Sequence, residues 1–275
     1  MKFHKINGTG NDFIIINNMD GAIDAGTLSR MAAKLCQRHM SIGADGLMAV
    51  SPSEIADFRM EFFNSDGSAG EMCGNGARCI CRYGYEMGLS GQTQTVETAS
   101  GVVTGRRIDK RFYRIRLTDP TVVKVDYKIE SDGVSFECGY VELGTPGLPH
   151  AVIHMPGLHN IEPRQLFDMA RHLRRHPTFP KGANINFYEV TGENSVFERT
   201  FERGVEDFTY ACGTGTAAVA LILTLKGESS GRGFAADMMG GRLIVDVERE
   251  AGRTALYLTG PTNIVAAGEI LDEEL

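Results

Sequence analysis

Apolar and polar residues alternate in two ways along the 275-residue chain. Short apolar or β-branched runs bounded by Gly, Asn, Asp or Pro predict strands, whereas apolar residues three and four positions apart predict helices. In the first half these patterns predict strands within 3–17 and at 47–50, 58–63, 95–97, 101–104 and 112–118, and helices at 24–39 and 77–89. In the second half they predict strands within 140–155 and at 197–201, 243–247 and 254–258, and helices at 163–176 and 217–225. The two halves therefore share one order of elements.

Several landmarks recur at a constant separation. The helical triplet Met169, Ala170 and Leu173 lies 138 residues after an equivalent triplet, and Cys212 lies 139 residues after Cys73. Because this offset is close to half the chain, we predict two pseudo-symmetric domains that arose by internal duplication. Many short strands and few helices, without regular alternation, indicate an α/β class with mixed or mostly antiparallel sheets rather than a doubly wound sheet.

Composition limits the class of protein and of partner. Hydrophobic residues make up 42% and charged residues 23%, as in globular proteins with a sizeable core. A net charge of −7 with scattered Lys and Arg argues against nucleic acid as a partner. No apolar run is long enough to span a bilayer, and the first residues lack the apolar segment of a signal peptide. With six cysteines, we expect reduced thiols in the cytoplasm and no membrane partner.

Candidate chemistry centres on the loop that leads to Cys73. Small and turn-forming residues precede this cysteine, and an amphipathic run follows it. We therefore expect Cys73 at a helix N-terminus, where unpaired N–H groups and the helix dipole favour a thiolate and can bind a carboxylate. Cys212, followed by Gly213-Thr214-Gly215 and an apolar run, repeats this setting in the second half.

Two such cysteines in related domains suit acid–base chemistry at one carbon. If they face each other across an interdomain cleft, one thiolate removes a proton while the other thiol supplies one to the opposite face, which inverts the centre. The most suitable C–H bond lies next to a carboxylate, and two helix N-termini would stabilise the carbanion. We therefore expect an active site in that cleft and a small-molecule amino-acid substrate.

Other interpretations of these residues fit the sequence less well. Cys36, Cys79, Cys81 and Cys138 have no matching motif, and we expect them to be buried thiols. The cysteine spacing is not that of a zinc site, and the Gly-rich loops lack the Lys-Ser/Thr of a phosphate-binding loop, so we predict neither a metal nor a cofactor. Among the histidines, His150 is distinguished by the Gly-Leu-Pro turn before it.

Six segments together resemble the diaminopimelate epimerase family. They are NGTGNDF at 7–13, GADGL at 43–47, FNSDGS at 63–68, MCGNGAR at 72–78, ERG at 202–204 and ACGTG at 211–215. The resemblance covers essentially the whole chain. It implies a cofactor-independent, two-cysteine epimerase of two domains, each a sheet wrapped around a central helix, with the active site in the interdomain cleft.

The resemblance also implies domain bounds and site residues. The last strand is expected to return to the first domain, which gives domains of 1–119 with 263–275 and of 120–262, and the enzyme is often a homodimer. By motif position the catalytic pair is Cys73 and Cys212. The substrate-contacting residues implied by motif position are Asn11, Asn64, Gly74, Asn75, His150, Asn184, Glu202, Arg203, Gly213 and Thr214.

Two departures from the family pattern concern the side chain of the substrate. The family's second-half turn usually reads Gly-Asn-Pro-His, whereas Leu148 here replaces the Asn that normally contacts the far end of the substrate. The loop from Arg203 to Cys212 is one residue longer than usual and carries Phe208 and Tyr210. Both changes leave the proton-transfer residues in place.

The sequence therefore supports several functions. The leading hypothesis is a diaminopimelate epimerase that interconverts the LL and meso forms for lysine and cell-wall biosynthesis without pyridoxal phosphate. A racemase of a single-centred amino acid such as histidine is favoured instead by Leu148 and the aromatic loop. A non-catalytic amino-acid-binding protein needs the cleft but not both thiols. A proton-shifting isomerase would use a carboxylate with His150 and tolerate the loss of Cys212.

Overall fold

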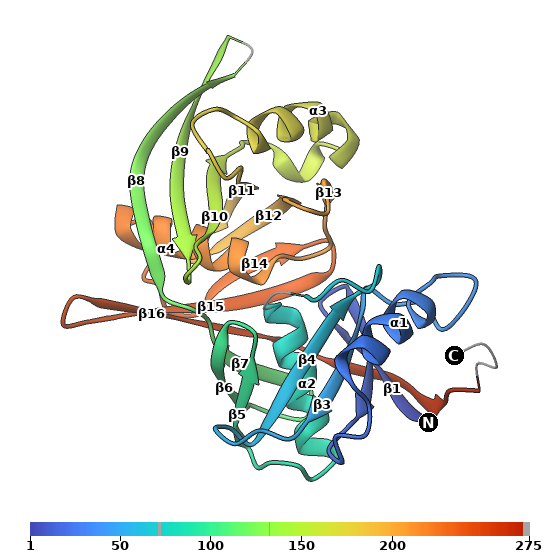
Figure 1. Cartoon of the computed structure of the whole chain (residues 1–275). Coiled ribbons are helices and arrows are strands. Elements are labelled where there is room, and N and C mark those ends of the chain that lie inside the picture. The colour runs from blue at the N-terminus through green and yellow to red at the C-terminus, as the bar shows by residue number, and fades with distance from the viewer. Residues whose placement is uncertain (71–72, 132, 272–275) are drawn as a thin grey trace. The chain divides into compact units, whose positions relative to one another are not determined.

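The computed structural model of the protein describes residues 1–70, 73–131 and 133–271 (Figure 1). The chain divides into two compact units, each of which is described by itself. Unit 1 comprises Met1–Ile115 and Gly260–Leu275, and unit 2 comprises Arg116–Thr259. The domain bounds expected from the sequence, after 119 and after 262, lie four and three residues beyond these divisions.

Unit 1 begins with a hairpin and is completed by the last strand of the chain. Its elements in chain order are β1 (Lys2–Gly8), β2 (Asn11–Asn17), α1 (Ala25–Leu35), β3 (Gly46–Ser51), β4 (Phe58–Asn64), α2 (Gly74–Glu86), β5 (Thr93–Thr98), β6 (Gly101–Arg107), β7 (Phe112–Arg116) and β17 (Asn263–Glu269). β17 pairs antiparallel with β1, which ties the end of the chain to this unit.

Unit 2 repeats this order after a long antiparallel hairpin. Its elements are β8 (Pro120–Ser131), β9 (Val134–Leu143), β10 (Leu148–His154), η1 (Leu158–Asn160), α3 (Pro163–Arg174), β11 (Asn184–Gly192), β12 (Ser195–Glu202), β13 (Asp207–Phe208), α4 (Gly213–Lys226), β14 (Phe234–Met238), β15 (Gly241–Glu250) and β16 (Arg253–Pro261). The sequence analysis did not predict β8. Ile129 is its one buried residue, so its apolar pattern is weak.

The two units share one pattern of strand pairing. In unit 1, β2 and β3 are parallel, β3 and β4 antiparallel, and β4 and β5 parallel. In unit 2, β10, β11, β12 and β14 repeat these pairings in the same order. Phe13 lies opposite Gly46 in unit 1, and Ala151 lies opposite Ile185, 138 and 139 residues later, in unit 2. The predicted duplication is therefore confirmed at the level of strand register.

α1 and α3 each pack one apolar face onto strands of their own unit. Asp24 caps α1 by accepting a hydrogen bond from Thr27 N at 2.9 Å. The buried residues Leu28, Met31 and Leu35 face β3 and β4. The buried residues of α3, Leu166, Ala170 and Leu173, are also three and four positions apart and face β11 and β12. This spacing made both helices predictable from the sequence.

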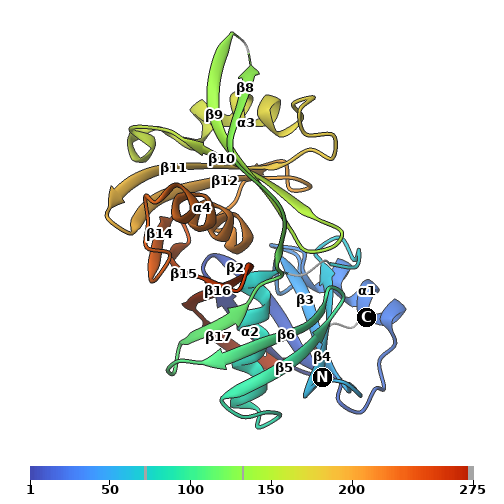
Figure 2. The same cartoon turned by 90° about the vertical axis from the view of Figure 1, so that its left-hand side faces the viewer.

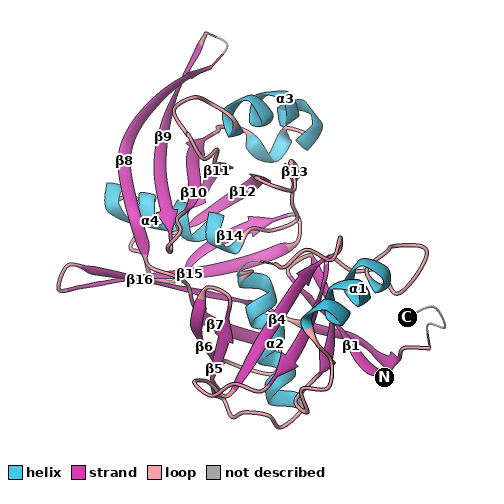
Figure 3. Cartoon of the chain, in the orientation of Figure 1, coloured by secondary structure: helices cyan, strands magenta, loops and turns pink. Residues whose placement is uncertain are grey.

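α2 and α4 lie inside their units. α4 is apolar around its whole circumference, so it must be covered on all sides. Figure 2 shows β11 and β12 on one side of α4 and β14 and β15 on the other. α2 contacts β1, β2 and β6 and is buried from Gly74 to Gly84, and Figure 3 shows both helices in cyan among the strands. Within the described ranges, no helix has both the length and the apolar character needed to cross a membrane.

Both central helices begin directly after a cysteine, as expected. Cys73 and Cys212 are the N-caps of α2 and α4, with extended backbone conformations at φ −111° and −120°. The helices start three or four residues before the apolar runs from which they were predicted. These first residues are mostly Gly, Asn and Thr, which carry no apolar periodicity.

Candidate active site

Cys73 caps α2 with its own side chain. Its Sγ accepts a hydrogen bond from Gly76 N at 3.4 Å. The N–H groups and the dipole of the helix N-terminus place partial positive charge beside this sulfur, which favours the thiolate over the thiol. The Cys73 side chain is half-buried. It therefore combines a position at a helix N-terminus with contact to solvent.

Glycines permit the close packing around the first turn of α2. A Cβ on Gly76 would collide with Met48 Cε on β3. A Cβ on Gly8, at the end of β1, would lie 2.7 Å from Cys79 Sγ and 3.0 Å from Asn75 O. Neither position has room for a side chain, so these glycines let two strands press against the start of the helix.

A buried polar network lies beneath this turn. Arg78 is fully buried, and its Nη2 donates to Thr9 Oγ1 and to Asn75 Oδ1, both at 2.9 Å. Asn75 Nδ2 donates to Asn11 Oδ1 at 2.6 Å, and Asn11 Nδ2 donates to Asp45 Oδ2 at 3.1 Å. Burial lowers the pKa of Arg78 to about 10, so the guanidinium stays charged at neutral pH. This charge, one turn from the cysteine, further favours the thiolate.

The network unites two of the predicted substrate residues, Asn11 and Asn75, and a third lies in the loop before Cys73. Asn64 Nδ2 donates to Ser68 Oγ at 3.0 Å, and Asn64 N donates to Ser68 O at 2.9 Å. Asn64 therefore orders the loop that begins at the end of β4. Residues 71 and 72, at the end of this loop, lie outside the described residues.

Cys212 has the equivalent position in unit 2 but a different environment. Its side chain is only 7% exposed, and its Sγ lies 3.5 Å from Thr214 Oγ1. Burial, with a contribution from the Glu202 carboxylate, raises the pKa of the Cys212 thiol well above its ordinary value. Cys212 is therefore a protonated thiol at neutral pH. The unit 1 cysteine is suited to act as a base, and Cys212 is suited to act as an acid.

The other predicted residues of unit 2 gather at one end of β10, β11 and β12. His150, near the start of β10, lies opposite Asn184, the first residue of β11. Arg203 directly follows β12, and its N–H donates to Asn184 Oδ1 at 2.8 Å. Glu202, the last residue of β12, accepts from Thr209 Oγ1 at 2.5 Å. Strand direction thus brings together three segments that are far apart in the sequence.

His150 and Arg203 present polar groups at this end without forming an ion pair. Burial, together with the charge of Arg203, lowers the pKa of His150 to about 3, so its ring is neutral. Arg203 Nη1 donates to Lys181 O at 3.0 Å, which fixes the direction of the guanidinium. An anionic ligand is the natural complement of this arrangement because the guanidinium carries a full positive charge.

Comparison with known proteins places these features in a family. The family model for diaminopimelate epimerase matches residues 3–113 and 144–265. The chain belongs to the diaminopimelate epimerase family. The diaminopimelate epimerase of Caldanaerobacter subterraneus subsp. tengcongensis is 35% identical over 287 residues, covering 98% of this chain and 99% of the relative. That of Methanothrix thermoacetophila is 38% identical, covering 100% of this chain and 98% of the relative.

Membership of the diaminopimelate epimerase family confirms the resemblance seen in the motifs and makes the chain an isomerase. Among solved structures, a phenazine biosynthesis protein of the PhzF family from Bacillus anthracis matches with a TM-score of 0.76 at 16% identity, covering 98% of this chain and 99% of that one. A hydroxyproline epimerase from Agrobacterium vitis matches with a TM-score of 0.70 at 17% identity, covering 98% and 90%. These likenesses support the two-domain α/β fold.

The remaining cysteines of this diaminopimelate epimerase family member are buried, as predicted. Burial raises the pKa of Cys36, Cys81 and Cys138 to about 12, and it also raises the pKa of Cys79. Thiols of this kind are inert as acids or nucleophiles at neutral pH. In the described part of the chain, no group of three or more His, Cys, Asp or Glu side chains is placed to hold a metal ion.

The structure changes the meaning of one departure from the family pattern. Phe208, in β13 within the longer loop, packs edge-on against Phe201 with ring centroids 5.4 Å apart and is partly buried against the core of unit 2. Of the two aromatic residues of this loop, Phe208 therefore packs against the core of its own unit. Tyr210 is 60% exposed. Leu148, the first residue of β10, is half-buried and lies two residues before His150. It is therefore still a difference from the family pattern close to the predicted site residues.

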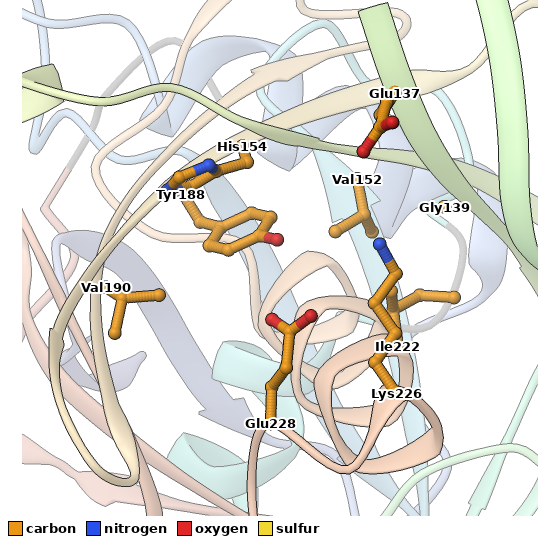
Figure 4. Close-up of a pocket in the computed structure, with 9 residues that line it drawn as sticks. All are labelled: Glu137, Gly139, Val152, His154, Tyr188, Val190, Ile222, Lys226 and Glu228. Atoms are coloured by element: carbon orange, nitrogen blue, oxygen red, sulfur yellow. The ribbon is translucent and has the colours of Figure 1, made fainter.

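A pocket of about 140 Å³ in unit 2 is distinct from the cysteine site. Its lining residues are Glu137, Gly139, Val152, His154, Tyr188, Val190, Ile222, Lys226 and Glu228 (Figure 4). Ile222 and Lys226 belong to the last turns of α4, whereas Cys212 precedes its first residue. A helix of this length measures about 20 Å, so the pocket lies near the far end of α4 from the cysteine.

Sequence reasoning missed the polar residues beneath the two helix starts. Arg78 was noticed only as part of a motif, and Glu198 was not noticed at all. Glu198 lies on β12 between Val196 and Thr200, on the face that is buried. Side chains alternate between the two faces of a strand, so the sequence places Glu198 on the same face as Val196. A carboxylate on a buried face is unusual and could have been noticed from the sequence.

Proposed function

We propose that the protein epimerises diaminopimelate between its LL and meso forms, without a cofactor, using Cys73 and Cys212 as the acid–base pair. The observation that carries this proposal is that each cysteine caps the central helix of its own unit, at positions related by the duplication. Near-full-length relatives named diaminopimelate epimerase support the choice of substrate.

The environments of the two thiols support different roles in the resting enzyme. Cys73 receives an N–H from Gly76 and lies one turn from the Arg78 cation, so it is the thiolate that removes the α-proton. Cys212 is a buried thiol, so it delivers a proton to the opposite face of the carbon. In the reverse reaction the two protonation states, and with them the two roles, are exchanged.

Main-chain groups at the two helix starts supply the remaining stabilisation. N–H groups of Gly74, Asn75, Gly213 and Thr214 would hold the reacting carboxylate, and the helix dipoles oppose the negative charge that develops on the α-carbon. The far carboxylate of diaminopimelate would bind the Arg203 guanidinium, which can donate two parallel hydrogen bonds. Asn64, Asn184 and Glu202 complete the proposed set of polar contacts.

Deuterium incorporation from heavy water tests the reaction and the two cysteines together. Cys73→Ala and Cys212→Ala should each lower racemisation at least about a thousandfold, within the range that general acid–base catalysis contributes. Cys138→Ala removes a buried thiol of unit 2 that lies away from the helix start, and it should retain activity. Turnover close to that of the wild type in either of the first two variants would overturn the pairing.

A substrate panel tests the identity of the amino acid. We expect kcat/KM for diaminopimelate to exceed that for histidine and other single-centred amino acids, because Arg203 needs a second carboxylate. Leu148 is the observation that favours a single-centred substrate, since it places an apolar side chain where the family has an amide. A preference of more than about tenfold for a single-centred amino acid would overturn the substrate and leave the two-cysteine mechanism intact.

We also propose that the enzyme works in the cytoplasm and as a homodimer. A catalytic thiolate needs reducing surroundings, which supports the first point, and the family resemblance supports the second. Fractionation of cells followed by activity measurement tests the location. Sedimentation of the purified chain at several concentrations tests the assembly, and a monomer throughout would refute the dimer.

A further inference from the structure

Four buried polar side chains form a continuous chain beneath the first turn of α4. Glu198 and Thr200 belong to β12, Asn186 to β11 and His150 to β10, and none of the four is more than 2% exposed. Thr200 Oγ1 lies 3.3 Å from Glu198 Oε1 and 3.0 Å from Asn186 Oδ1. Asn186 Nδ2 lies 3.3 Å from His150 Nδ1. The two-cysteine mechanism uses none of Glu198, Thr200 and Asn186.

Main-chain oxygens determine how the Asn186 amide is oriented. Asn186 Nδ2 lies 3.0 Å from Ala151 O and 3.3 Å from Asn184 O. Carbonyl oxygens only accept hydrogen bonds, so the NH₂ group must face them and Oδ1 must face Thr200. Gly215 in the first turn of α4 makes this possible, because a Cβ there would collide with Asn186 Oδ1 and lie 3.2 Å from Thr200 Oγ1.

The hydroxyl hydrogens then determine the state of Glu198. Thr200 has one hydroxyl hydrogen and donates it to Asn186 Oδ1. Thr216, on α4, donates its hydroxyl hydrogen to Cys212 O at 3.0 Å. Thr200 Oγ1 lies 3.3 Å from Glu198 Oε1, and because the only hydroxyl hydrogen of Thr200 is directed at Asn186 Oδ1, a neutral Glu198 carboxyl can donate to this hydroxyl. Burial raises the pKa of Glu198 to about 8, and this effect outweighs the contacts with Thr216 and Thr200, which lower the pKa.

At the other end of the chain, the amide determines the tautomer of the imidazole. The NH₂ group of Asn186 faces His150 Nδ1, so this nitrogen must be the unprotonated acceptor and the ring hydrogen must lie on Nε2. Burial lowers the pKa of His150 to about 3, which excludes a ring protonated on both nitrogens. His150 Nε2 is buried, and among the residues that the structure describes it has no hydrogen-bond partner.

We propose that Glu198, Thr200 and Asn186 are positioning residues that hold His150 in the Nε2–H tautomer, so that His150 donates a hydrogen bond to an anionic group of the substrate and does not accept its proton. The charge of Arg203 acts on the same ring, so both groups favour a carboxylate. The role toward substrate rests on the proposed function, whereas the tautomer does not.

Nitrogen-15 NMR of protein labelled at the histidine rings measures the tautomer directly. The variant His150→Gln identifies the signals of this ring among those of the seven histidines. In the wild type we expect a protonated Nε2 and an unprotonated Nδ1 throughout the neutral range. Asn186→Asp replaces the donor with an acceptor and should move the hydrogen to Nδ1. Asn186→Leu removes the donor and should give a mixture of both tautomers.

Kinetics of matched variants test the positioning role. Thr200→Val removes the hydroxyl that joins Glu198 to Asn186, and we expect kcat/KM to fall about tenfold, equivalent to about 1.4 kcal/mol. Thr224→Val is the matched control, because Thr224 donates within α4 to Ala220 O at 2.7 Å and lies outside the chain of four. Glu198→Leu should behave like Thr200→Val. Glu198→Gln, whose amide still donates, should restore both kcat/KM and the wild-type tautomer.

The two kinds of measurement separate the possible failures. A hydrogen on His150 Nδ1 in the wild-type protein overturns the proposal whatever the activity. Equal loss of activity in Thr200→Val and Thr224→Val also overturns it, because a general effect of losing a hydroxyl would then explain both. An Nε2–H signal in a protein that turns over no amino acid supports the tautomer and refutes the proposed function instead.

Discussion

Replacing Glu198 with Gln should remove a pH dependence of stability that originates inside unit 2. Burial raises the pKa of Glu198 from its ordinary value of 4.5 to about 8. Between these values the folded protein holds one proton more than the unfolded chain, so stability falls as the pH rises through this window. One such proton changes the free energy of unfolding by about 1.4 kcal/mol per pH unit, or by about 4 kcal/mol between about pH 5 and about pH 8.

The Gln side chain has nearly the shape of the acid and keeps N–H donors for Thr200 and Thr216. We therefore expect the variant and the wild type to have similar stability near the acid end of the window, where Glu198 is protonated in the folded protein. Towards its alkaline end the variant should become the more stable of the two. The difference arises because folded wild-type protein must keep Glu198 protonated at a pH where the unfolded chain has lost that proton, which lowers its free energy of unfolding.

Urea denaturation followed by circular dichroism measures this difference, and the chain has no Trp to follow by fluorescence. Subtracting wild type from variant at each pH cancels the other titrating groups, and the nearby Cys212 thiol stays protonated throughout. Glu193→Gln, at an exposed position, is the control and should give a constant difference. The difference in free energy of unfolding between Glu198→Gln and the wild type should change across this pH window. A change of less than about 1 kcal/mol would refute the buried neutral carboxyl.

Three further changes test the packing and the electrostatics of the site. Gly215→Ala forces a methyl group against Asn186 Oδ1 and should cost about 1–3 kcal/mol in urea denaturation, with kcat/KM lowered, whereas Gly91→Ala, in open space, should cost little. Arg78→Met removes the hydrogen bonds that Arg78 donates to Thr9 Oγ1 and Asn75 Oδ1 and should cost about 1–3 kcal/mol. It should also slow alkylation of Cys73 at neutral pH, and an unchanged rate would contradict the role given to this cation. Arg203→Lys should lower kcat/KM for diaminopimelate about ten- to a hundredfold while leaving racemisation of any single-centred substrate less affected.

The features that could be predicted from the sequence were those set by residues close together in the chain or by the repeat of the two halves. The amphipathic spacing of α1 and α3, the turn before each cysteine and the constant offset between the halves are local or repeating signals. They were sufficient for the duplication and for the placement of Cys73 and Cys212 at helix starts, but they did not predict β11 or β14. β8 was missed because nearly all of its residues remain partly or fully exposed, so burial leaves little trace in its composition.

The polar networks were not predictable because they depend on strand register. Glu198, Asn186 and His150 belong to three different strands, and only the pairing of β10, β11 and β12 brings their side chains into line. The same holds for Arg78, whose contact with Thr9 spans 69 residues of sequence. The packing of Phe208 against the core of unit 2 was also not predictable, because it depends on the tertiary contact with Phe201.

The buried charges beneath the two helix starts have a consequence for the catalytic cycle. The Arg78 cation favours a negative sulfur at Cys73 in unit 1, whereas burial, with a smaller contribution from Glu202, keeps the Cys212 thiol of unit 2 protonated. In the two-cysteine mechanism each turnover leaves the proton on the opposite sulfur, so the free enzyme emerges in the less stable of two ionisation states. It must exchange a proton with water before it can act again in the same direction. Under the proposed mechanism, we therefore expect this recovery of the empty enzyme, rather than the chemistry at carbon, to limit the rate at high substrate concentration.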